Sequence, residues 1–443
     1  MDKSSTKIRS LTVLIALSVC IFLPGCGLNT MISGNVSRNL RHSEILEHHY
    51  VGLAVYSLAD HKMVFAQNAD KYFTPASNTK LFTFYGGLKM IKDRLPALRY
   101  IERGDSLIFW GTGDPSFLQT KLKGNDAYQF LKQSNKQLFL ANGRYLEGVY
   151  GKGWAWDDYN DYYLAEINEL PVMDNLVSIT VPQACAVIRP KLFRDSFVLD
   201  SSVKDAPYKV TRDFNGNRFR YPPTVPPAGF EQQVPYKVDL RITAALLADT
   251  LKRPVGLIGM EMPAEAKTVY GLHKDSVLKE MMLPSDNFIA EQLLLVYSDQ
   301  LGKELSTEKA IDHIQRTYLS GLSAKPVWVD GSGLSRYNLV TPADLVSLLE
   351  MIYTEVGDRK RLFALLPAGG KTGTLKNAYP KTDQPYVFGK TGSLSNVYNQ
   401  SGYLVTKKGR IYIFSFMNNN FVDPTSEVRK AMAGLMTELY NKF

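Results

Sequence analysis

Segments with the patterns of strands and helices occupy both ends of this chain, and a long middle of different texture separates them. Residues 51–58 and 63–66 are short β-rich runs around a hairpin signal, and residues 403–405 and 411–417 flank a second hairpin signal. From Ser426 onward the apolar residues fall on one face of a helix. Strands divided between the two ends must meet in space to form a sheet, so the pattern predicts one α/β domain assembled from both termini.

The middle of the chain, residues 90–265, reads as an insertion into that domain. It has short strand-like runs, many turn residues and a proline cluster at residues 222–227, and a short helix pattern precedes the return to the first domain. A chain of 443 residues with 45% hydrophobic and 21% charged residues is long enough for two or three packed domains. We therefore predict a domain from residues 49–89 and 266–443, and a mostly β insertion of one or two smaller domains.

The first 25 residues have the layout of a secretion signal. Basic residues precede an apolar run at 11–23 that is too short to span a membrane, and the run ends at Gly25-Cys26, which looks like a lipobox. Ordinary signal cleavage and an uncleaved anchor stay open as alternatives. We expect residues 1–25 to be a lipoprotein-type signal peptide, Cys26 to carry the lipid, residues 26–48 to form a linker, and the protein to reside in the cell envelope.

Cysteine content and charge exclude several other classes of protein. Lipidation of Cys26 and loss of Cys20 with the signal would leave only Cys185 as a thiol, so no intramolecular disulfide framework is expected. No residues have metal-ligand spacing, and we expect no metal and no cofactor. The net charge is +9, but the basic residues are scattered without interleaved aromatic residues, which indicates a solvated surface and argues against a nucleic-acid partner.

The segment Ser77-Asn78-Thr79-Lys80 places a hydroxyl and an amine three residues apart at the expected start of a helix. Residues at this spacing lie on one helical face, one turn from each other, which suits proton transfer between them. The six histidines stand in no recognisable triad context, so an amine is the better candidate base. Taken alone, the segment is explained more simply by a helix N-cap.

Two further segments carry groups for handling a peptide. Ser285-Asp286-Asn287 opens a helix pattern and is read most simply as a cap with Ser285 as the capping residue; functionally, Ser285 can pass a proton to a leaving amine and Asn287 can hold a substrate amide. Lys390-Thr391-Gly392-Ser393 follows the β-like run 386–388. Its glycine would let a substrate backbone lie along the strand edge, and its lysine and hydroxyls would capture a carboxylate.

These three motifs, in this order, resemble the signatures of the penicillin-binding protein and serine β-lactamase superfamily. Residues 330–336, 113–116 and 153–158 are similar to segments of its penicillin-binding protein 4 group, the D-alanyl-D-alanine carboxypeptidases and endopeptidases. The resemblance covers nearly the whole chain after the signal. It implies a β-lactamase/transpeptidase-like fold, an α+β sandwich with an antiparallel sheet flanked by helices.

The same resemblance implies a mechanism and a set of partners. Peptidoglycan stem peptides would be cut through an acyl-enzyme, penicillins would be covalent inhibitors, and the oxyanion hole would be formed by backbone N–H groups of Ser77 and Ser393. The implied site residues share a role in proton transfer or in substrate binding. They are Ser77 as nucleophile and Lys80 as base, with Ser285, Asn287 and Lys390 as further catalytic residues and Thr391, Gly392 and Ser393 as substrate-binding residues.

Several alternatives stay beside this interpretation. A second Lys-Thr-Gly triplet, Lys371-Thr372-Gly373, lies in loop-like sequence, so we expect the triplet that begins at Lys390 to be the one in the active site. We also expect the charge of Lys390 to lower the pKa of Lys80. Glu166 and Glu169 are expected to be surface carboxylates without a catalytic role. Two alternative functions remain: the chain is a β-lactamase, or it is a non-catalytic lipoprotein that binds peptidoglycan.

Overall fold

The computed structural model describes residues 25–182, 186–203 and 206–443, so the predicted signal segment up to residue 24 and Cys185 lie outside the described residues. Its main sheet has the strand order β14-β15-β16-β1-β2, and every neighbouring pair is antiparallel. The strands are β1 (Tyr50–Ser57), β2 (Lys62–Gln67), β14 (Val387–Leu394), β15 (Val397–Val405) and β16 (Ile411–Asn419). Because β1 pairs with β16, the two ends of the chain meet in one sheet, as the sequence predicted.

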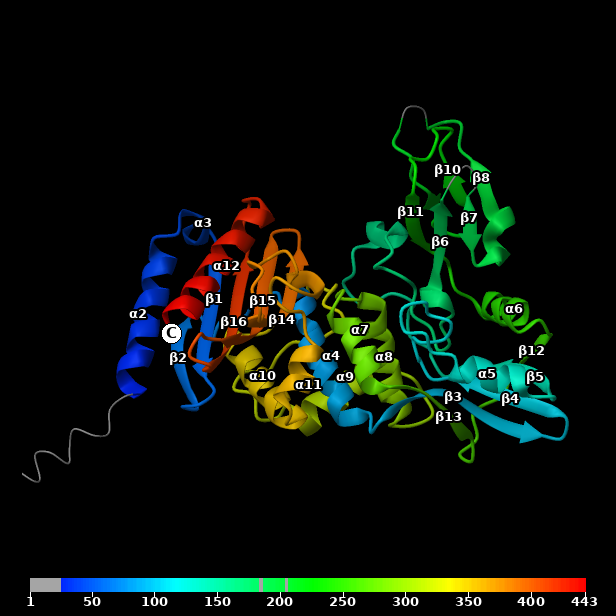
Figure 1. Cartoon of the computed structure of the whole chain (residues 1–443). Helices are drawn as coiled ribbons and strands as arrows, with labels where there is room; N and C mark the ends of the chain where they lie inside the picture. Colours follow the sequence, from blue (N-terminus) through cyan, green and yellow to red (C-terminus); the bar gives the residue numbers. More distant parts are fainter. Residues whose placement is uncertain (1–24, 183–185, 204–205) are drawn as a thin grey trace, which may run out of the picture.

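One face of the main sheet is covered by both terminal segments of the described chain (Figure 1). The helices on this face are α2 (Gly25–Arg41), α3 (Glu44–Glu47) and α12 (Thr425–Lys442). The prediction of a linker at residues 26–48 is therefore wrong. Ile32, Val36 and Leu40 recur every four residues, which places them on one helical face, and all three are buried against the sheet.

The other face of the sheet packs against a cluster of helices that forms the largest core. These are α4 (Lys80–Met90), α7 (Lys274–Met282), α8 (Asn287–Asp299), α9 (Thr307–Tyr318), α10 (Pro342–Val356) and α11 (Arg359–Ala364). Helix α8 is buried from Phe288 to Asp299, which identifies it as the central helix of the cluster. Helices α4 and α8 pack on each other, so motifs that start these helices are brought to one place.

The insertion contains a second five-stranded sheet with the order β12-β5-β4-β3-β13. Its elements are β3 (Arg94–Arg103), β4 (Ser106–Gly111), β5 (Gln137–Ala141), β12 (Val255–Ile258), β13 (Lys267–His273), α5 (Asp126–Gln133) and α6 (Leu240–Leu251). Two parallel pairs and two helices make it more mixed than the mostly β insertion that we expected. Strand β13 lies beyond the expected boundary at residue 265, yet it belongs to this sheet because its backbone pairs with β3.

Two small three-stranded sheets, β11-β6-β7 and β8-β10-β9, complete the insertion and rise above the second large sheet (Figure 1). Their strands are β6 (Leu176–Val181), β7 (Val187–Arg189), β8 (Phe197–Leu199), β9 (Thr211–Arg212), β10 (Phe219–Tyr221) and β11 (Phe230–Pro235). Short 3-10 helices lie at η1 (Ala76–Thr79), η2 (Trp156–Asn160), η3 (Met173–Asn175), η4 (Lys191–Ser196) and η5 (Gly373–Leu375).

A buried ion-pair cluster joins the insertion to the end of helix α8. The carboxylate of Asp299, whose side chain is fully buried, lies 2.6 Å from Arg99 and 2.7 Å from Arg144. Both arginines belong to the insertion, and charge-assisted hydrogen bonds of this kind are geometrically specific. The cluster therefore holds the insertion in a defined position next to the helix that carries Asn287.

Candidate active site

Ser77 lies in η1, and Lys80 is the first residue of α4, so the predicted hydroxyl–amine pair sits on one helical turn. The Oγ of Ser77 lies 3.0 Å from the Nζ of Lys80. The residue before the serine, Ala76, has a left-handed φ of 49°, a conformation that persists only where the surroundings impose it. Gly333 leaves room for it, because a Cβ on that glycine would meet the Ala76 carbonyl oxygen at 1.9 Å.

The amine of Lys80 is fully buried and held by two further oxygens. Its Nζ donates to Oδ1 of Asn287 at 2.6 Å and to the Ser332 carbonyl at 2.8 Å. A neutral amine that uses both hydrogens in this way keeps its lone pair for the Ser77 hydroxyl. Burial lowers the pKa of Lys80 to about 8, against the charges of nearby carboxylates, which raise it. A useful fraction of the amine is therefore neutral near physiological pH.

Glu291 supports this arrangement and was missed by the sequence analysis. It stands one helical turn after Asn287 on α8, and its carboxylate accepts hydrogen bonds from the backbone N–H groups of Gly331 at 2.9 Å and Ser332 at 2.7 Å. Glu291 thus holds the same residue whose carbonyl holds Lys80. Burial raises the pKa of Glu291 to about 8. The spacing of four residues between Asn287 and Glu291 was the available signal, because it places both on one face of the helix.

The structure corrects the assignment of the helix cap at Ser285. The N-cap of α8 is Asp286, whose Oδ1 accepts from the backbone N–H of Ile289 at 2.9 Å. Ser285 has a left-handed φ of 65° and lines the cleft, and no described residue hydrogen-bonds its hydroxyl. This leaves the hydroxyl available to a substrate.

Asn287 is placed differently from its expected contact with a substrate amide. Its Oδ1 accepts from Lys80, and its Nδ2 lies 3.3 Å from the carbonyl of Tyr163 in the insertion. Both ends of the side-chain amide therefore have protein partners. Asn287 connects the base with the wall of the cleft that the insertion provides.

Lys390, Thr391, Gly392 and Ser393 all lie in β14, the edge strand of the main sheet. Lys390 is fully buried, and its Nζ donates to the Thr391 carbonyl at 2.7 Å. Burial, together with the charge of Lys80, holds the pKa of Lys390 well below its usual range. Burial is thus the first cause of both lowered pKa values, and repulsion between the two lysines adds to it.

Position 392 needs a glycine because of close packing within the protein, whereas we expected the glycine to make room for a substrate backbone. A Cβ at this position would meet the carbonyl oxygen of Pro75 at 2.4 Å and the backbone nitrogen of Ser77 at 3.1 Å. The glycine therefore allows β14 to pack tightly on η1, which fixes the strand beside the nucleophile.

The earlier triplet, Lys371-Thr372-Gly373, contributes to the cleft through the residue that follows it. The hydroxyl of Thr391 donates to Oγ1 of Thr374 at 2.8 Å, and Thr374 lines the cleft, whereas Lys371 is exposed and outside it. The structure thus brings Lys390, and not Lys371, into the buried site.

These motifs meet in a cleft of about 880 Å³. The main domain contributes Ser77, Ser285, Asn287, Thr391 and Ser393, and the insertion contributes residues around 153–163 together with Asp174 and Gln233. Within the described ranges, no group of three or more His, Cys, Asp or Glu side chains is arranged to hold a metal ion.

The expectation of surface positions for Glu166 and Glu169 is wrong. Glu166 is buried and accepts from the backbone N–H of Val238 at 2.8 Å, and Glu169 accepts from the backbone N–H groups of Arg144 and Tyr145 at 3.0 and 3.1 Å. Both carboxylates hold the loops of the insertion together, which is a structural role.

Comparison with known proteins places the whole chain in one family. The profile of the D-Ala-D-Ala carboxypeptidase 3 (S13) family matches residues 32–439. The chain is 25% identical to the D-alanyl-D-alanine carboxypeptidase DacB of Haemophilus influenzae, over 88% of this chain and 90% of the relative. It is 26% identical to the penicillin-sensitive carboxypeptidase A of Dictyostelium discoideum, over 72% and 71% of the two chains.

Solved structures confirm the predicted fold class. The crystal structure of penicillin-binding protein 4 (dacB) from Haemophilus influenzae superposes with a TM-score of 0.72 at 21% identity, covering 92% of this chain and 99% of that chain. Bd3459, a predatory peptidoglycan endopeptidase from Bdellovibrio bacteriovorus, superposes with a TM-score of 0.51 at 14% identity, covering 88% and 93%. With the family profile spanning nearly the whole chain, this protein belongs to the D-Ala-D-Ala carboxypeptidase 3 (S13) family of serine peptidases.

Proposed function

We propose that Ser77 is the nucleophile and Lys80 the general base with which this chain cleaves D-alanyl peptide bonds of peptidoglycan. The observation that carries the proposal is the distance of 3.0 Å between the Ser77 Oγ and a fully buried lysine amine whose other two contacts are hydrogen-bond acceptors. Neutral Lys80 takes the hydroxyl proton while Oγ attacks the D-alanine carbonyl carbon. The products of this half-reaction are an ester on Ser77 and a free amine.

The remaining motif residues have complementary roles in this proposal. Ser285, whose hydroxyl is unpartnered among the described residues and faces the cleft, passes a proton to the departing amine. The backbone N–H groups of Ser77 and Ser393 stabilise the developing oxyanion. A water molecule then hydrolyses the ester, and the shortened peptide leaves.

Lys390 and Thr391 receive the substrate carboxylate in this proposal. A nearby anion favours the charged form of a lysine, so binding of the carboxylate raises the pKa of Lys390 from its low value in the free enzyme. The lysine therefore gains its charge together with its partner. Thr374 orients the Thr391 hydroxyl through their 2.8 Å hydrogen bond.

Location in the cell envelope follows from the family, and we propose in addition that Cys26 carries a lipid anchor. The basic residues and apolar run before Gly25-Cys26 support export and lipidation. In the described part of the chain, no helix is both long and apolar enough to cross a bilayer. Metabolic labelling with palmitate should mark the protein and should fail with Cys26→Ser; equal labelling of the variant contradicts the anchor.

Reaction with a fluorescent penicillin tests the catalytic proposal. The expected result is a stable adduct on Ser77 that is absent in Ser77→Ala and strongly slowed in Lys80→Ala. Ser347→Ala is a control on α10, because among the described residues its hydroxyl bonds only to the backbone of its own helix, and this variant should label normally. Rapid turnover of the adduct would instead indicate a β-lactamase, and the absence of any adduct in the native protein would indicate a non-catalytic peptidoglycan-binding lipoprotein.

A further inference from the structure

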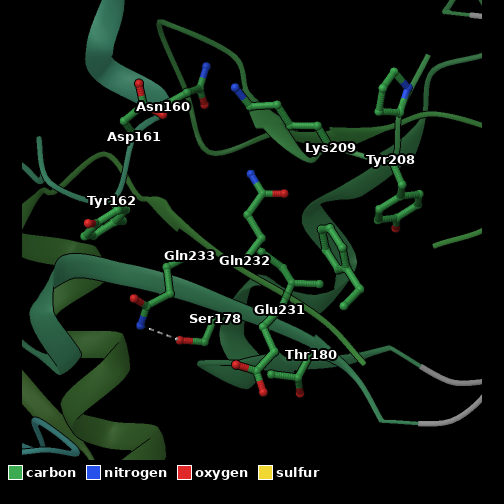
Figure 2. A pocket seen from close by; sticks show the side chains of 13 residues that line it. Asn160, Asp161, Tyr162, Ser178, Thr180, Tyr208, Lys209, Glu231, Gln232 and Gln233 are labelled. Carbon is green, nitrogen blue, oxygen red and sulfur yellow. Dashed lines mark hydrogen bonds between the residues drawn. The ribbon is translucent and has the colours of Figure 1, made fainter. Parts of the chain in front are cut away.

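A second pocket, of about 770 Å³, lies in the insertion next to the cleft (Figure 2). We call it the insert pocket; it lies between β6, β11, residues 160–162 at the end of η2, and residues 207–209. Tyr162 and Gln233 line both the insert pocket and the cleft that contains Ser77. The two hollows are therefore adjacent, and a ligand that extends from the cleft past these two residues reaches the second one.

The insert pocket presents side-chain charges of both signs that have no partner among the described residues. In that part of the chain the side chains of Lys209 and Glu231 take part in no ion pair or hydrogen bond, and both residues are exposed. Figure 2 shows the Lys209 side chain reaching toward Asn160 on one side of the pocket and the Glu231 carboxylate near Thr180 on the other. A ligand with a carboxylate and an amine at separate positions, such as a peptide, satisfies both groups.

The form of the floor also suits a peptide. Strand β11 is the edge of its three-stranded sheet, so its outer backbone groups are not used by β6. The Gln232 side chain accepts from the backbone N–H of Val210 at 2.8 Å and donates to the Val210 carbonyl at 2.7 Å. The backbone of Val210 is therefore bonded to a side chain and does not pair with the backbone of β11. An extended peptide can therefore lie along this edge by strand addition.

The insert pocket lies near the part of the cleft in which the departing amine is expected. Asn287 contacts the carbonyl of Tyr163, and the next residue, Tyr162, forms the border between the cleft and the insert pocket. Ser285, the proposed proton donor to the departing amine, stands two residues before Asn287 and lines the same cleft. The part of the cleft that holds Ser285 and Asn287 thus borders the insertion.

We infer that the insert pocket binds the second stem peptide of a cross-linked substrate, the one that carries the departing amine. The inference rests on the proposed function and extends it to endopeptidase cleavage. In that reaction the amide between a D-alanine carbonyl and a side-chain amine breaks, an ester to Ser77 forms, and the proton lost by the Ser77 hydroxyl leaves on the amine. Lys209 contacts a carboxylate, and Glu231 an amine, of the second peptide.

Purified full-length enzyme with Lys209→Ala or Glu231→Gln is compared on four probes: a fluorescent penicillin, a monomeric pentapeptide muropeptide, a cross-linked muropeptide dimer and intact sacculi. Loss of one charge-assisted hydrogen bond should lower kcat/KM for the dimer by about tenfold. Rates with the penicillin and the monomer should stay at the native level. Lys191→Ala is the matched control, since Lys191 is an exposed lysine of the insertion that lies outside the pocket.

Three outcomes overturn the inference without touching the proposed function. Unchanged cleavage of the dimer excludes a role in cross-link binding, and an equal loss on monomer and dimer excludes selectivity for the second peptide. A loss seen only with intact sacculi assigns the insert pocket to the glycan strand instead. Failure of the native enzyme to react with penicillin, in contrast, refutes the proposed function itself.

Discussion

The pH dependence of acylation is the most direct test of how the buried Lys80 acts. A lysine with an ordinary pKa of about 10.4 is neutral in about one molecule in 2,500 at pH 7, whereas a pKa of about 8 makes about one in ten neutral. Burial of the amine therefore increases the reactive fraction by roughly 200-fold, equivalent to about 3 kcal/mol. This is the contribution to acylation that we attribute to burial.

Timed acylation by a fluorescent penicillin between pH 5.5 and 9.5 measures this contribution. The second-order rate constant should rise about tenfold per pH unit at low pH and level off near pH 8, because only neutral Lys80 removes the Ser77 proton. The carboxylate of the penicillin is ionised throughout this range. Thermal unfolding across the same pH values is the control for loss of folded protein.

Lys390→Ala separates burial from charge repulsion as the cause of the low pKa. Because burial is the first cause of the lowered pKa of Lys80, the variant should acylate more slowly but level off at the same pH. A midpoint that moves toward 10 in Lys390→Ala would show that the Lys390 charge sets the pKa of Lys80. A native rate that is independent of pH between 6 and 9 would refute Lys80 as the titrating base.

Five further variants test the packing, a hydrogen bond and the ion pairs around the site. Gly333→Ala should destabilise the fold by about 3 kcal/mol or more in urea denaturation and abolish penicillin binding, whereas Gly434→Ala, on an exposed face of α12 with free space, should stabilise it by about 0.5–1 kcal/mol. Equal effects of the two would contradict the role of Gly333. Thr374→Val should raise KM for a pentapeptide about fivefold through loss of one hydrogen bond, while Lys371→Ala should leave KM unchanged. A larger rise of KM in Lys371→Ala than in Thr374→Val would show that Lys371 belongs to the active site. Asp299→Asn should cost about 3–5 kcal/mol of unfolding free energy, since it leaves two arginines without their buried partner, and a loss below 1 kcal/mol would argue against that cluster.

The main sheet and the motif residues were predictable because their signals are local. The hairpin patterns identified β1, β2, β15 and β16, and their division between the two ends of the chain required pairing across the whole sequence. The segment at residues 26–48 was misjudged because its many polar residues hide the few buried apolar ones, which among the described side chains are Ile32, Val36, Leu40 and Leu46. Strand β13 was assigned to the wrong part because pairing with β3 depends on a partner more than 160 residues away.

The sequence by itself determined the chemical groups at the centre of this protein. Spacing along one helical turn sets Ser77 beside Lys80, and that relation needs no distant contact. Only the tertiary structure decided what the lysine can do, because its pKa depends on burial and on acceptors at Asn287 and Ser332, more than 200 residues further along the chain. The same is true of Gly392, whose small size is needed where β14 packs on η1. A pKa and a close approach are properties of the surroundings, and folding supplies those surroundings.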